Sequence, residues 1–431
     1  AQMTADYMAY DVLPGAVHVY NAHNISVMDC TFSNLGNIGV NLYHGVANAK
    51  ITGNTFVDIG ATAIMVAPHI TGVIADQDLY NPSDKRVCVH DVEISNNYVA
   101  WVGVQYHRSC GITNVLGAKV TISDNEIAYG SNIGISNGWG WTLEERMIRE
   151  NIITRNDVHH IGMNGSDLGG IYTLSYQPDT VISDNYVHEI NRDYNGHGGD
   201  SPAYGLYIDE GSNRLSILNN QIAHAQETMQ SIYFHTIGTE FTVEGNKFLL
   251  CGDKLDQEII ANSGVKTNDR LPYLHYGDYK NAIEYMQAGI WTNANESGKY
   301  GYKIKLDKDV TVYGLGRFYV TGNTGNHTLA IYDESGKRVA VCAVNMKNAK
   351  TDAQGFVNAK FENSVTLKKG KSYFVVSEEV QFGDMYCDGL TKIFSVSDSG
   401  INIVGISKGN SFSTVRNANS AFVGLNILLE K

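Results

Sequence analysis

The sequence predicts an all-β protein, a right-handed parallel β-helix followed by a β-sandwich domain. Two observations indicate this fold class. A short unit with an asparagine at one fixed place recurs along the chain as far as Leu250. From about Tyr300 the pattern changes to short alternating strands separated by Gly, Asn and Asp turns, which is typical of a sandwich. A chain of 431 residues has room for a long solenoid and a further module.

The repeated unit reads apolar-x-apolar-x-x-Asn-x-apolar. Its two-residue alternation identifies a strand, and we expect the asparagine to occupy a turn that tolerates left-handed backbone. In coils stacked about 4.8 Å apart, each asparagine would bond to the coils above and below. One coil cannot bury its apolar face alone, so stacking must stabilise the fold. The predicted ladder consists of Asn54, Asn97, Asn125, Asn156, Asn185, Asn220 and Asn246.

The repeat is irregular at two places. The first copy has Cys30 where other copies have asparagine, which predicts a buried ladder residue. The interval from Asn54 to Asn97 is the longest, and it predicts either a long loop or an unrecognised coil around Pro68 to Arg86.

Each coil also supplies a second strand. Aligned on their first apolar residue, these strands place one outward row on adjacent coils. Aromatic faces in such a row suit sugar rings, although cross-coil stacking that only stiffens the sheet is the alternative. The row consists of Thr113, Ser136, Tyr172, Tyr207 and Tyr233.

Three segments follow from these patterns. Residues 1–252 form the β-helix, and 253–299 form a capping segment with helices expected over 255–264 and 280–289 that cover the open end of the sheet. Residues 300–431 form the sandwich, which we hypothesise binds carbohydrate. We expect the chain to act as a monomer.

Composition narrows the partners. A formal net charge of −13 argues against nucleic acid, whose phosphates need a basic face, and is compatible with sugars. No apolar run is long enough to span a membrane. The six cysteines show no metal-like spacing, so we expect no cofactor; Cys342 and Cys387 either pair or remain thiols, and the others are expected to be buried thiols.

Acidic residues cluster in two adjacent coils. Asp167 precedes Gly169 and Gly170, whose small size would let another chain or a ligand approach the backbone. Asp209 and Glu210 end the matching strand one coil later, and an insertion with His197 lies between them. Two carboxylates flanking a bond are what glycoside hydrolysis needs. The alternative is that these acids cap turns or form ion pairs.

Strand alignment sets a condition on this pair. Asp167 precedes its strand while Asp209 closes its own, so the two meet only if the turn before Gly169 folds back over the sheet. The register favours the longer carboxyl separation and hence inversion, with Glu210 as the reserve acid. His235 ends the next strand and would orient a carboxylate or cap the strand.

Aromatic and histidine residues complete the candidates. Trp139 and Trp141 follow an outward strand, and the glycines around them favour an exposed wall over the core. His159 and His188 fall at equivalent places in neighbouring coils and should stack. No third ligand is spaced to join them, so we expect structural imidazoles and no metal.

These motifs resemble a known family. The succession Asn137-Gly138-Trp139-Gly140-Trp141, Asp167 to Leu174, Gln177-Pro178-Asp179-Thr180 and Tyr207 to Ser212 resembles the β-helix glycoside hydrolases of family 141. Pro14 to Val17 and Cys30 to Gly36 fit the same group, and the likeness spans roughly residues 10 to 270. The resemblance implies α-L-fucosidase or xylanase activity, with the family's essential acids matching Asp167 and Asp209. It also implies a secreted or cell-surface protein.

The resemblance has one departure, and two alternatives stay open. Family members have several hundred residues before this point, so N-terminal coils and the subsites they form are expected to be missing. A polysaccharide lyase is the alternative enzyme; lyases on this fold use Ca²⁺ and a basic residue, for which Arg192 and Arg214 are the nearest candidates. A non-catalytic glycan-binding β-helix is the other alternative.

Overall fold

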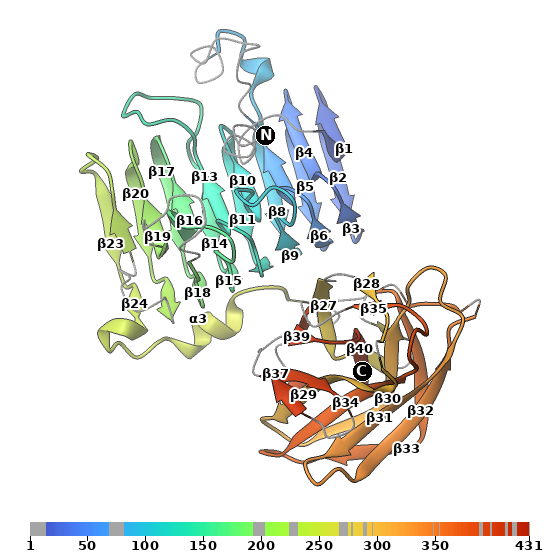
Figure 1. Ribbon diagram of the computed structural model, residues 1–431. Helices are drawn as coiled ribbons and strands as arrows, with labels where there is room; N and C mark the ends of the chain where they lie inside the picture. Colours follow the sequence, from blue (N-terminus) through green and yellow to red (C-terminus); the bar gives the residue numbers. More distant parts are fainter. Residues whose placement is uncertain are drawn as a thin grey trace. The chain divides into compact units, whose positions relative to one another are not determined.

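The computed structural model describes most of the chain. The described residues are 14–68, 82–192, 203–223, 232–266 and 275–430, the last range with gaps at 277–278, 288–290, 295, 348, 353, 388–390, 397–398, 410–412 and 416–419. The chain divides into two compact units, residues 1–270 and 271–431 (Figure 1). Each unit is described by itself below.

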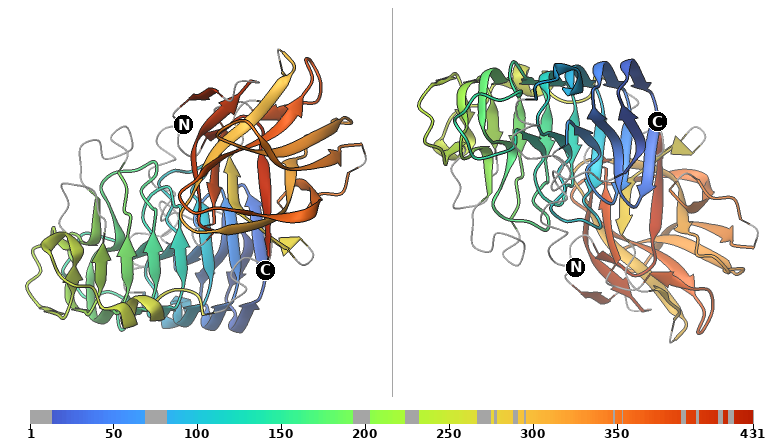
Figure 2. Two further views of the ribbon diagram at one scale, coloured as in Figure 1. Left: turned by 90° about the horizontal axis from the view of Figure 1, so that it is seen from below. Right: turned by 90° about the horizontal axis from the view of Figure 1, so that it is seen from above.

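Three parallel sheets of eight strands each form a β-helix in the first unit, which confirms the predicted fold class. Every coil contributes one strand to each sheet, and the coils stand side by side in Figure 2. Sheet 1 consists of β1 (Gly15–Tyr20), β4 (Ile38–His44), β7 (Ile64–Val66), β10 (Ile112–Asn114), β13 (Ile135–Asn137), β16 (Leu168–Thr173), β19 (Ala203–Ile208) and β22 (Ile232–Phe234). Sheet 2 consists of β2 (His23–Met28), β5 (Ala47–Thr52), β8 (His90–Ser95), β11 (Ala118–Ser123), β14 (Ile152–Thr154), β17 (Tyr176–Ser183), β20 (Asn213–Leu218) and β23 (Phe241–Glu244). Sheet 3 consists of β3 (Thr31–Leu35), β6 (Thr55–Ile59), β9 (Tyr98–Val102), β12 (Glu126–Ala128), β15 (Asp157–His159), β18 (Tyr186–His188), β21 (Gln221–Ala223) and β24 (Lys247–Phe248).

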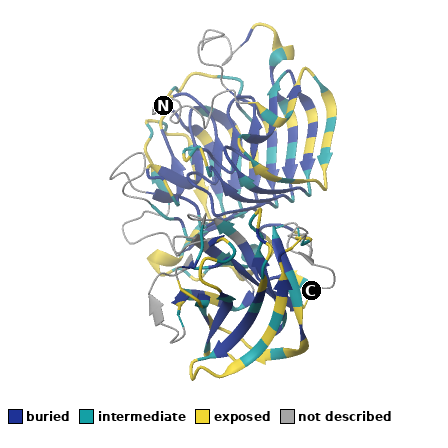
Figure 3. Ribbon diagram, turned by 45° about the vertical axis from the view of Figure 1, so that its right-hand side comes forward, coloured by how far each residue is buried: buried dark blue, intermediate teal, exposed yellow. Residues whose placement is uncertain are grey.

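The alternating apolar residues of these strands point inward and make one continuous core. In sheet 2, Val120 and Ile122 are fully buried, whereas Lys119 is exposed and Thr121 is partly exposed. The middle coils are the most deeply buried part of the β-helix (Figure 3). Inward burial of one strand face is what the period-2 pattern predicts.

The ladder asparagines lie in one line, as predicted. Each side-chain nitrogen donates a hydrogen bond to the side-chain oxygen of the next asparagine over 2.9–3.0 Å. The nitrogen of Asn97 also donates to the Ile51 carbonyl of the preceding coil over 2.8 Å. Its oxygen accepts the backbone N–H of Asn54 over 2.9 Å. Because the same pattern repeats at each inner rung, the polar groups of these buried amides are paired within the protein.

The turn residue differs from the prediction. The ladder asparagine does not have left-handed backbone; the residue before it does, with φ of 54° at Asn96 and 58° at Asp124. The corner is therefore made one residue earlier, and the asparagine follows it with its side chain buried between coils. The left-handed residues of this corner are Asp29, Gly53, Asn96, Asp124, Arg155, Asp184, Asn219 and Gly245.

The cysteine predictions hold only in part. Cys30 is exposed rather than buried, although its backbone N–H does donate to Asn54 Oδ1 over 3.0 Å at the end of the ladder. The predicted burial is therefore wrong at this position, which belongs to the first of the described coils. Cys88 and Cys110 are buried thiols, whereas Cys251 is exposed. Cys342 is a free thiol, and the side chain of Cys387 lies outside the described residues.

The long interval in the repeat is a loop and not a coil. Asn54 bonds directly to Asn97, and β5 pairs directly with β8. No further coil therefore stands between these two strands, and the described part of the interval contains the short helix η1 (Lys85–Val87).

A single helical turn and one α-helix follow the last coil. These are η2 (Leu249–Cys251) and α3 (Gln257–Asn262), which Asp256 caps by accepting bonds from two backbone N–H groups. Beyond α3, Gly264 donates to the Arg155 carbonyl over 2.9 Å and Lys266 donates to Asn96 Oδ1 over 2.7 Å. The helix over 255–264 is confirmed, but this segment runs back along one corner of the coils rather than across their open end.

The second unit contains antiparallel sheets, and a helix expected over 280–289 is wrong because β26 and β27 occupy that segment. Tyr302 in one large sheet donates through its hydroxyl to the Leu425 carbonyl in the other over 2.9 Å, and buried Arg317 pairs with Glu379 over 3.0 Å. The two large sheets thus share one core. The five-stranded sheet is β25 (His275–Tyr276), β26 (Tyr279–Asn281), β40 (Leu425–Glu430), β30 (Val310–Phe318) and β33 (Phe356–Leu367). The six-stranded sheet is β32 (Arg338–Asn345), β31 (Asn326–Asp333), β34 (Ser372–Glu379), β29 (Gly298–Leu306), β37 (Ile401–Lys408) and β38 (Ser413–Val415). Two small sheets are β27 (Ile283–Gln287) with β36 (Thr391–Ser395) and β39 (Ser420–Ala421), and β28 (Trp291–Thr292) with β35 (Tyr386–Cys387).

Asn156→Ala should lower the free energy of unfolding by about 3–5 kcal/mol, because it removes several buried hydrogen bonds and leaves neighbouring donors and acceptors unpaired. Denaturant unfolding measures the change. Asn246→Ala is the matched control: this last rung is only partly buried, so its loss should cost about 1 kcal/mol. Equal losses at both rungs would contradict the ladder's role.

The second unit should fold alone when it includes its first strands. β26 pairs with β40 and β27 pairs with β36, so a fragment of residues 271–431 keeps these pairings and one of residues 300–431 loses them. We expect cooperative thermal unfolding by circular dichroism from the longer fragment and a lower Tm, or no transition, from the shorter one. A longer fragment without a cooperative transition would refute this.

Candidate functional site

The strand register of sheet 1 confirms that the predicted residues form one row, but four of them are buried and only Tyr233 is partly exposed. Thr113 pairs with Ser136, Ser136 with Tyr172, Tyr172 with Tyr207, and Tyr207 with Tyr233. Small residues therefore precede three tyrosines along one line of the sheet.

The tyrosines of this row pack against one another. Tyr172 and Tyr207 meet edge to face at 5.1 Å, and their residues are only 8% and 4% exposed. Tyr204 stacks on Tyr233 at 4.4 Å and meets Tyr207 at 5.0 Å. The row therefore offers ring edges and hydroxyls more than open aromatic faces. Sequence reasoning missed Tyr204, because strict alternation would turn it away from Tyr207 and the chain departs from alternation at Gly205.

Asp209 lies at the end of β19 in a mostly buried setting. The Tyr172 hydroxyl donates to its Oδ2, and His235 Nδ1 lies 3.3 Å from its Oδ1. Burial raises the pKa of the Asp209 carboxyl, while the bond from Tyr172 and the nearby His235 act in the opposite direction. His235 was expected to orient a carboxylate or cap a strand, and it lies against this carboxylate with its side chain 56% exposed.

Asp167 reaches the same tyrosine from the other coil. It is exposed, and its left-handed backbone (φ 59°) directly before β16 turns it over the sheet. The Tyr207 hydroxyl lies 3.4 Å from Asp167 Oδ1 and 3.3 Å from His235 Nδ1. Burial is the main cause that raises the pKa of Tyr207, and the negative charges of Asp209 and Asp167 raise it further. Asp167 therefore reaches the Tyr207 hydroxyl directly, and Asp209 is connected to the same hydroxyl through His235.

The glycines after Asp167 serve packing within the protein. A Cβ on Gly169 would lie 2.9 Å from Tyr207 Cβ, and one on Gly170 would lie 2.3 Å from Val187 Cγ1. A neighbouring coil and the core approach these positions, where sequence analysis expected another chain or a ligand.

The loop after β13, which carries Trp139 and Trp141, contacts the turn that follows Asp209. A Cβ on Gly211 would lie 2.5 Å from the Thr142 nitrogen, so the loop and the turn are in close contact. Trp139 is 9% exposed and packs into the core, whereas Trp141 is 59% exposed and meets Trp139 edge to face at 4.9 Å. Only Trp141 fits the expected exposed wall.

A second amide ladder supports this loop, and sequence reasoning missed it. Asn114 donates to Asn137 Oδ1 over 2.8 Å, and Asn137 donates to Gln177 Oε1 over 2.5 Å. Gln177 in turn donates to the Leu174 carbonyl over 2.7 Å. The signal was the asparagine that ends two consecutive strands of sheet 1, Asn114 in β10 and Asn137 in β13, whereas Gln177 joins them from β17 of sheet 2.

Among the described candidates, the side chains of Glu210 and Arg214 form no hydrogen bond or ion pair with Asp167 or Asp209. Glu210 is exposed, and its carbonyl accepts the Ser175 N–H over 3.1 Å. His197 lies outside the described residues. Arg214 belongs to sheet 2, where it lies 3.4 Å from Asp179 and 3.8 Å from Glu240.

The stacked histidines lie on sheet 3, away from the acid pair. His159 and His188 are in register, with ring centres 4.9 Å apart and nearly parallel planes, as predicted. A third group does join them: ligand atoms of Asp157, His159 and His188 all lie within 4.8 Å of one another. The prediction that no third ligand is spaced to join the histidines is therefore wrong, because Asp157 stands two residues before His159 on the same strand face.

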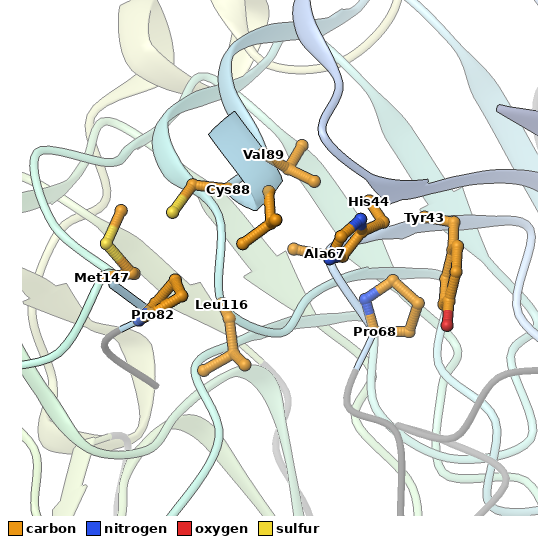
Figure 4. A pocket seen from close by; sticks show the side chains of 10 residues that line it. Tyr43, His44, Ala67, Pro68, Pro82, Cys88, Val89, Leu116 and Met147 are labelled. Carbon is orange, nitrogen blue, oxygen red and sulfur yellow. The ribbon is translucent and has the colours of Figure 1, made fainter. Parts of the chain in front are cut away.

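A small hollow opens at the ends of earlier strands of sheet 1. Figure 4 shows Tyr43, His44 and Pro68 lining it. Tyr20 stacks on His44 with ring centres 5.3 Å apart. The sequence signal for this hollow was the aromatic residues that end β1 and β4, and it was not recognised.

No helix among the described residues is both long and apolar enough to cross a membrane.

Comparisons with known proteins found one family model and several solved structures that are similar to parts of this chain. Residues 287–404 match a family model described as a domain of unknown function, DUF4082. A solved structure named glycoside hydrolase is 27% identical, with a TM-score of 0.53, over 59% of this chain and 41% of that one. A periplasmic alginate epimerase (12% identity, TM-score 0.33, 52% of this chain and 50% of that one) and the A-module of a mannuronan C-5 epimerase from Azotobacter vinelandii (12%, 0.31, 52% and 58%) are more distant. No curated protein matches. The chain spans less than half the length of the glycoside hydrolase, which is similar to it in fold and in part of its sequence.

Proposed function

We propose that the chain is a glycoside hydrolase that cleaves a plant or host polysaccharide outside the cell or at its surface. The observation that carries the proposal is one connected group of side chains. Exposed Asp167 lies 3.4 Å from the Tyr207 hydroxyl, this hydroxyl lies 3.3 Å from His235 Nδ1, and the same nitrogen lies 3.3 Å from the buried carboxyl of Asp209. Similarity to a glycoside hydrolase of the same fold supports it. Fucosidase-like or xylanase-like substrates, a monomeric state and sugar binding by the second unit belong to the same proposal.

The environments of the two acids assign their roles. Burial favours the protonated form of Asp209, which makes it the general acid that gives its proton to the glycosidic oxygen as the C–O bond breaks. Asp167 is in contact with water, so it is placed to take a proton from the water molecule that attacks the anomeric carbon. This division of labour inverts the sugar's configuration and needs carboxyl groups about 6.5–9.5 Å apart.

The surrounding residues position these acids and the sugar. Tyr172 and His235 hold the two oxygens of Asp209, and Tyr207 bridges toward Asp167. Exposed Trp141 borders the turn that carries Asp209 and offers a flat face to a sugar ring. Tyr233 and His197 are further candidate sugar contacts, and Glu210 is the reserve acid.

Asp209→Asn and Asp167→Asn should each reduce kcat by about 100- to 10,000-fold, because they keep the side-chain shape and remove the proton chemistry. A panel of defined oligosaccharides first identifies a cleaved substrate. Its turnover by each variant is then measured, with binding by calorimetry expected to persist.

Asp179→Asn is the matched control for this experiment, since Asp179 is an exposed acid with the same left-handed backbone on the next strand, and its variant should hydrolyse normally. Near-normal hydrolysis by both Asp167 and Asp209 variants would show that these acids are structural. An unsaturated sugar product would instead identify a lyase.

Tyr172→Phe should move the alkaline limb of the kcat/KM profile to higher pH. The Tyr172 hydroxyl stabilises the charged form of Asp209, so its removal raises the pKa of this carboxyl further and keeps the general acid protonated to higher pH. Tyr233→Phe, in the same row, should leave that limb in place even if the rate changes. An alkaline limb unmoved in Tyr172→Phe would contradict the assignment of Asp209 as the acid.

A further inference from the structure

Three side chains of types that bind metal ions lie together on sheet 3, whereas the acid pair flanks strands of sheet 1. Asp157 and His159 are the first and third residues of β15, and His188 is the third residue of β18. Period-2 alternation turns first and third residues of a strand to the same face. The register that stacks β15 on β18 then brings the three side chains together.

Their ligand atoms converge on one place. His188 Nε2 lies 2.9 Å from Asp157 Oδ1, and the ligand atoms of all three residues lie within 4.8 Å of one another. A fourth group, Glu126, stands one coil earlier in register with Asp157, and its Oε1 lies 3.6 Å from His159 Nε2. Bonds of about 2.0–2.2 Å to one ion need only small side-chain rotations from this arrangement.

Each imidazole is fixed from behind by a partner on its other nitrogen. His188 Nδ1 bonds to Glu189, and His159 Nδ1 lies 2.8 Å from His160 Nδ1. A carboxylate on the outer nitrogen, as Glu189 provides for His188, is a usual support of a metal-binding imidazole, because it sets the tautomer and the ring orientation. His160 can accept a hydrogen bond from His159 in the same way. Both rings therefore present Nε2 to the shared point.

We propose that Asp157, His159 and His188, with Glu126 beside them, bind one divalent transition-metal ion of the zinc class. Imidazole and carboxylate ligands in a compact set select such an ion over Ca²⁺ or Mg²⁺, which prefer oxygen ligands alone. The His159 and Glu126 side chains are only 7% and 9% exposed, and those of His188 and Asp157 are 15% and 22% exposed.

The burial and position of these groups assign a structural role to the ion. It would join strands β12, β15 and β18 of three successive coils, in addition to their backbone hydrogen bonds. The segment after α3 closes over one side, since a Cβ on Gly264 would lie 3.0 Å from Asp157 Cβ. Metal binding would therefore also stabilise the segment after α3 in its position beside β15.

The test uses the full, tag-free chain after treatment with a chelator, titrated with ZnCl₂ and with CoCl₂. We expect one equivalent of either metal to bind, a rise in Tm that grows with metal concentration, and a Co²⁺ absorption spectrum typical of four ligands including nitrogen. His188→Gln and His159→Gln should weaken binding by at least about 100-fold, the upper end of the loss caused by removing an outer partner.

His90→Gln is the matched control, since His90 also has a neighbouring carboxylate (Asp91, 2.6 Å away) but lies outside this cluster. Its affinity should equal that of the unaltered chain. Asp157→Asn, of nearly the same shape, replaces any histidine variant that circular dichroism shows to be unfolded without metal. An unaltered chain that binds neither metal, or binding undiminished in His188→Gln or Asp157→Asn, would overturn the proposal. Oligosaccharide hydrolysis is a separate readout, so the failure of either proposal is seen without the other.

Discussion

The structure depends on the hydrogen bonds of one row of buried asparagines. Each amide between Asn97 and Asn220 bonds to the amide of the next coil and to the backbone of the preceding one. An unpaired buried amide costs about 1–3 kcal/mol, so a slip of one coil against its neighbours would be penalised at several groups at once. The ladder therefore fixes the register of the coils as well as stabilising them. A slip of one residue would also turn the buried face of a strand toward solvent, which opposes it further.

Register is what makes a functional surface from separate coils. Because sheet 1 is locked in step, Tyr172 and Tyr207 stand in one row and Asp209 meets His235 from the next coil. The same register on sheet 3 stacks His159 on His188. Residues 28 to 40 positions apart thus act as near neighbours, each coil adding one side chain to a line.

Much of this could be predicted from the sequence, because a repeat exposes its own period. The asparagine ladder and the tyrosine row followed directly from alignment of the copies. The left-handed corner was placed one residue late, since asparagine tolerates such backbone and so seemed to explain both features at once. The predicted burial of Cys30 was wrong because this residue belongs to the first described coil, where fewer of the described residues cover a side chain than at inner coils. The β-strands in 280–289 pair with strands far along the chain, such as β40, and a local pattern does not carry that information.

The site itself needed tertiary geometry. Sequence patterns selected Asp167 and Asp209 and could state the fold-back before Gly169 only as a condition, and they did not select Tyr204 or Asp157. The measurement that tests the account most directly is a crystal structure of the Asp209→Asn variant with an uncleaved oligosaccharide bound. The account predicts a sugar beside Trp141, with its glycosidic oxygen within hydrogen-bonding distance of residue 209 and Asp167 on the opposite side of the ring. An oligosaccharide bound only elsewhere, as in the hollow beside Tyr43 and His44 or on the second unit, would contradict it.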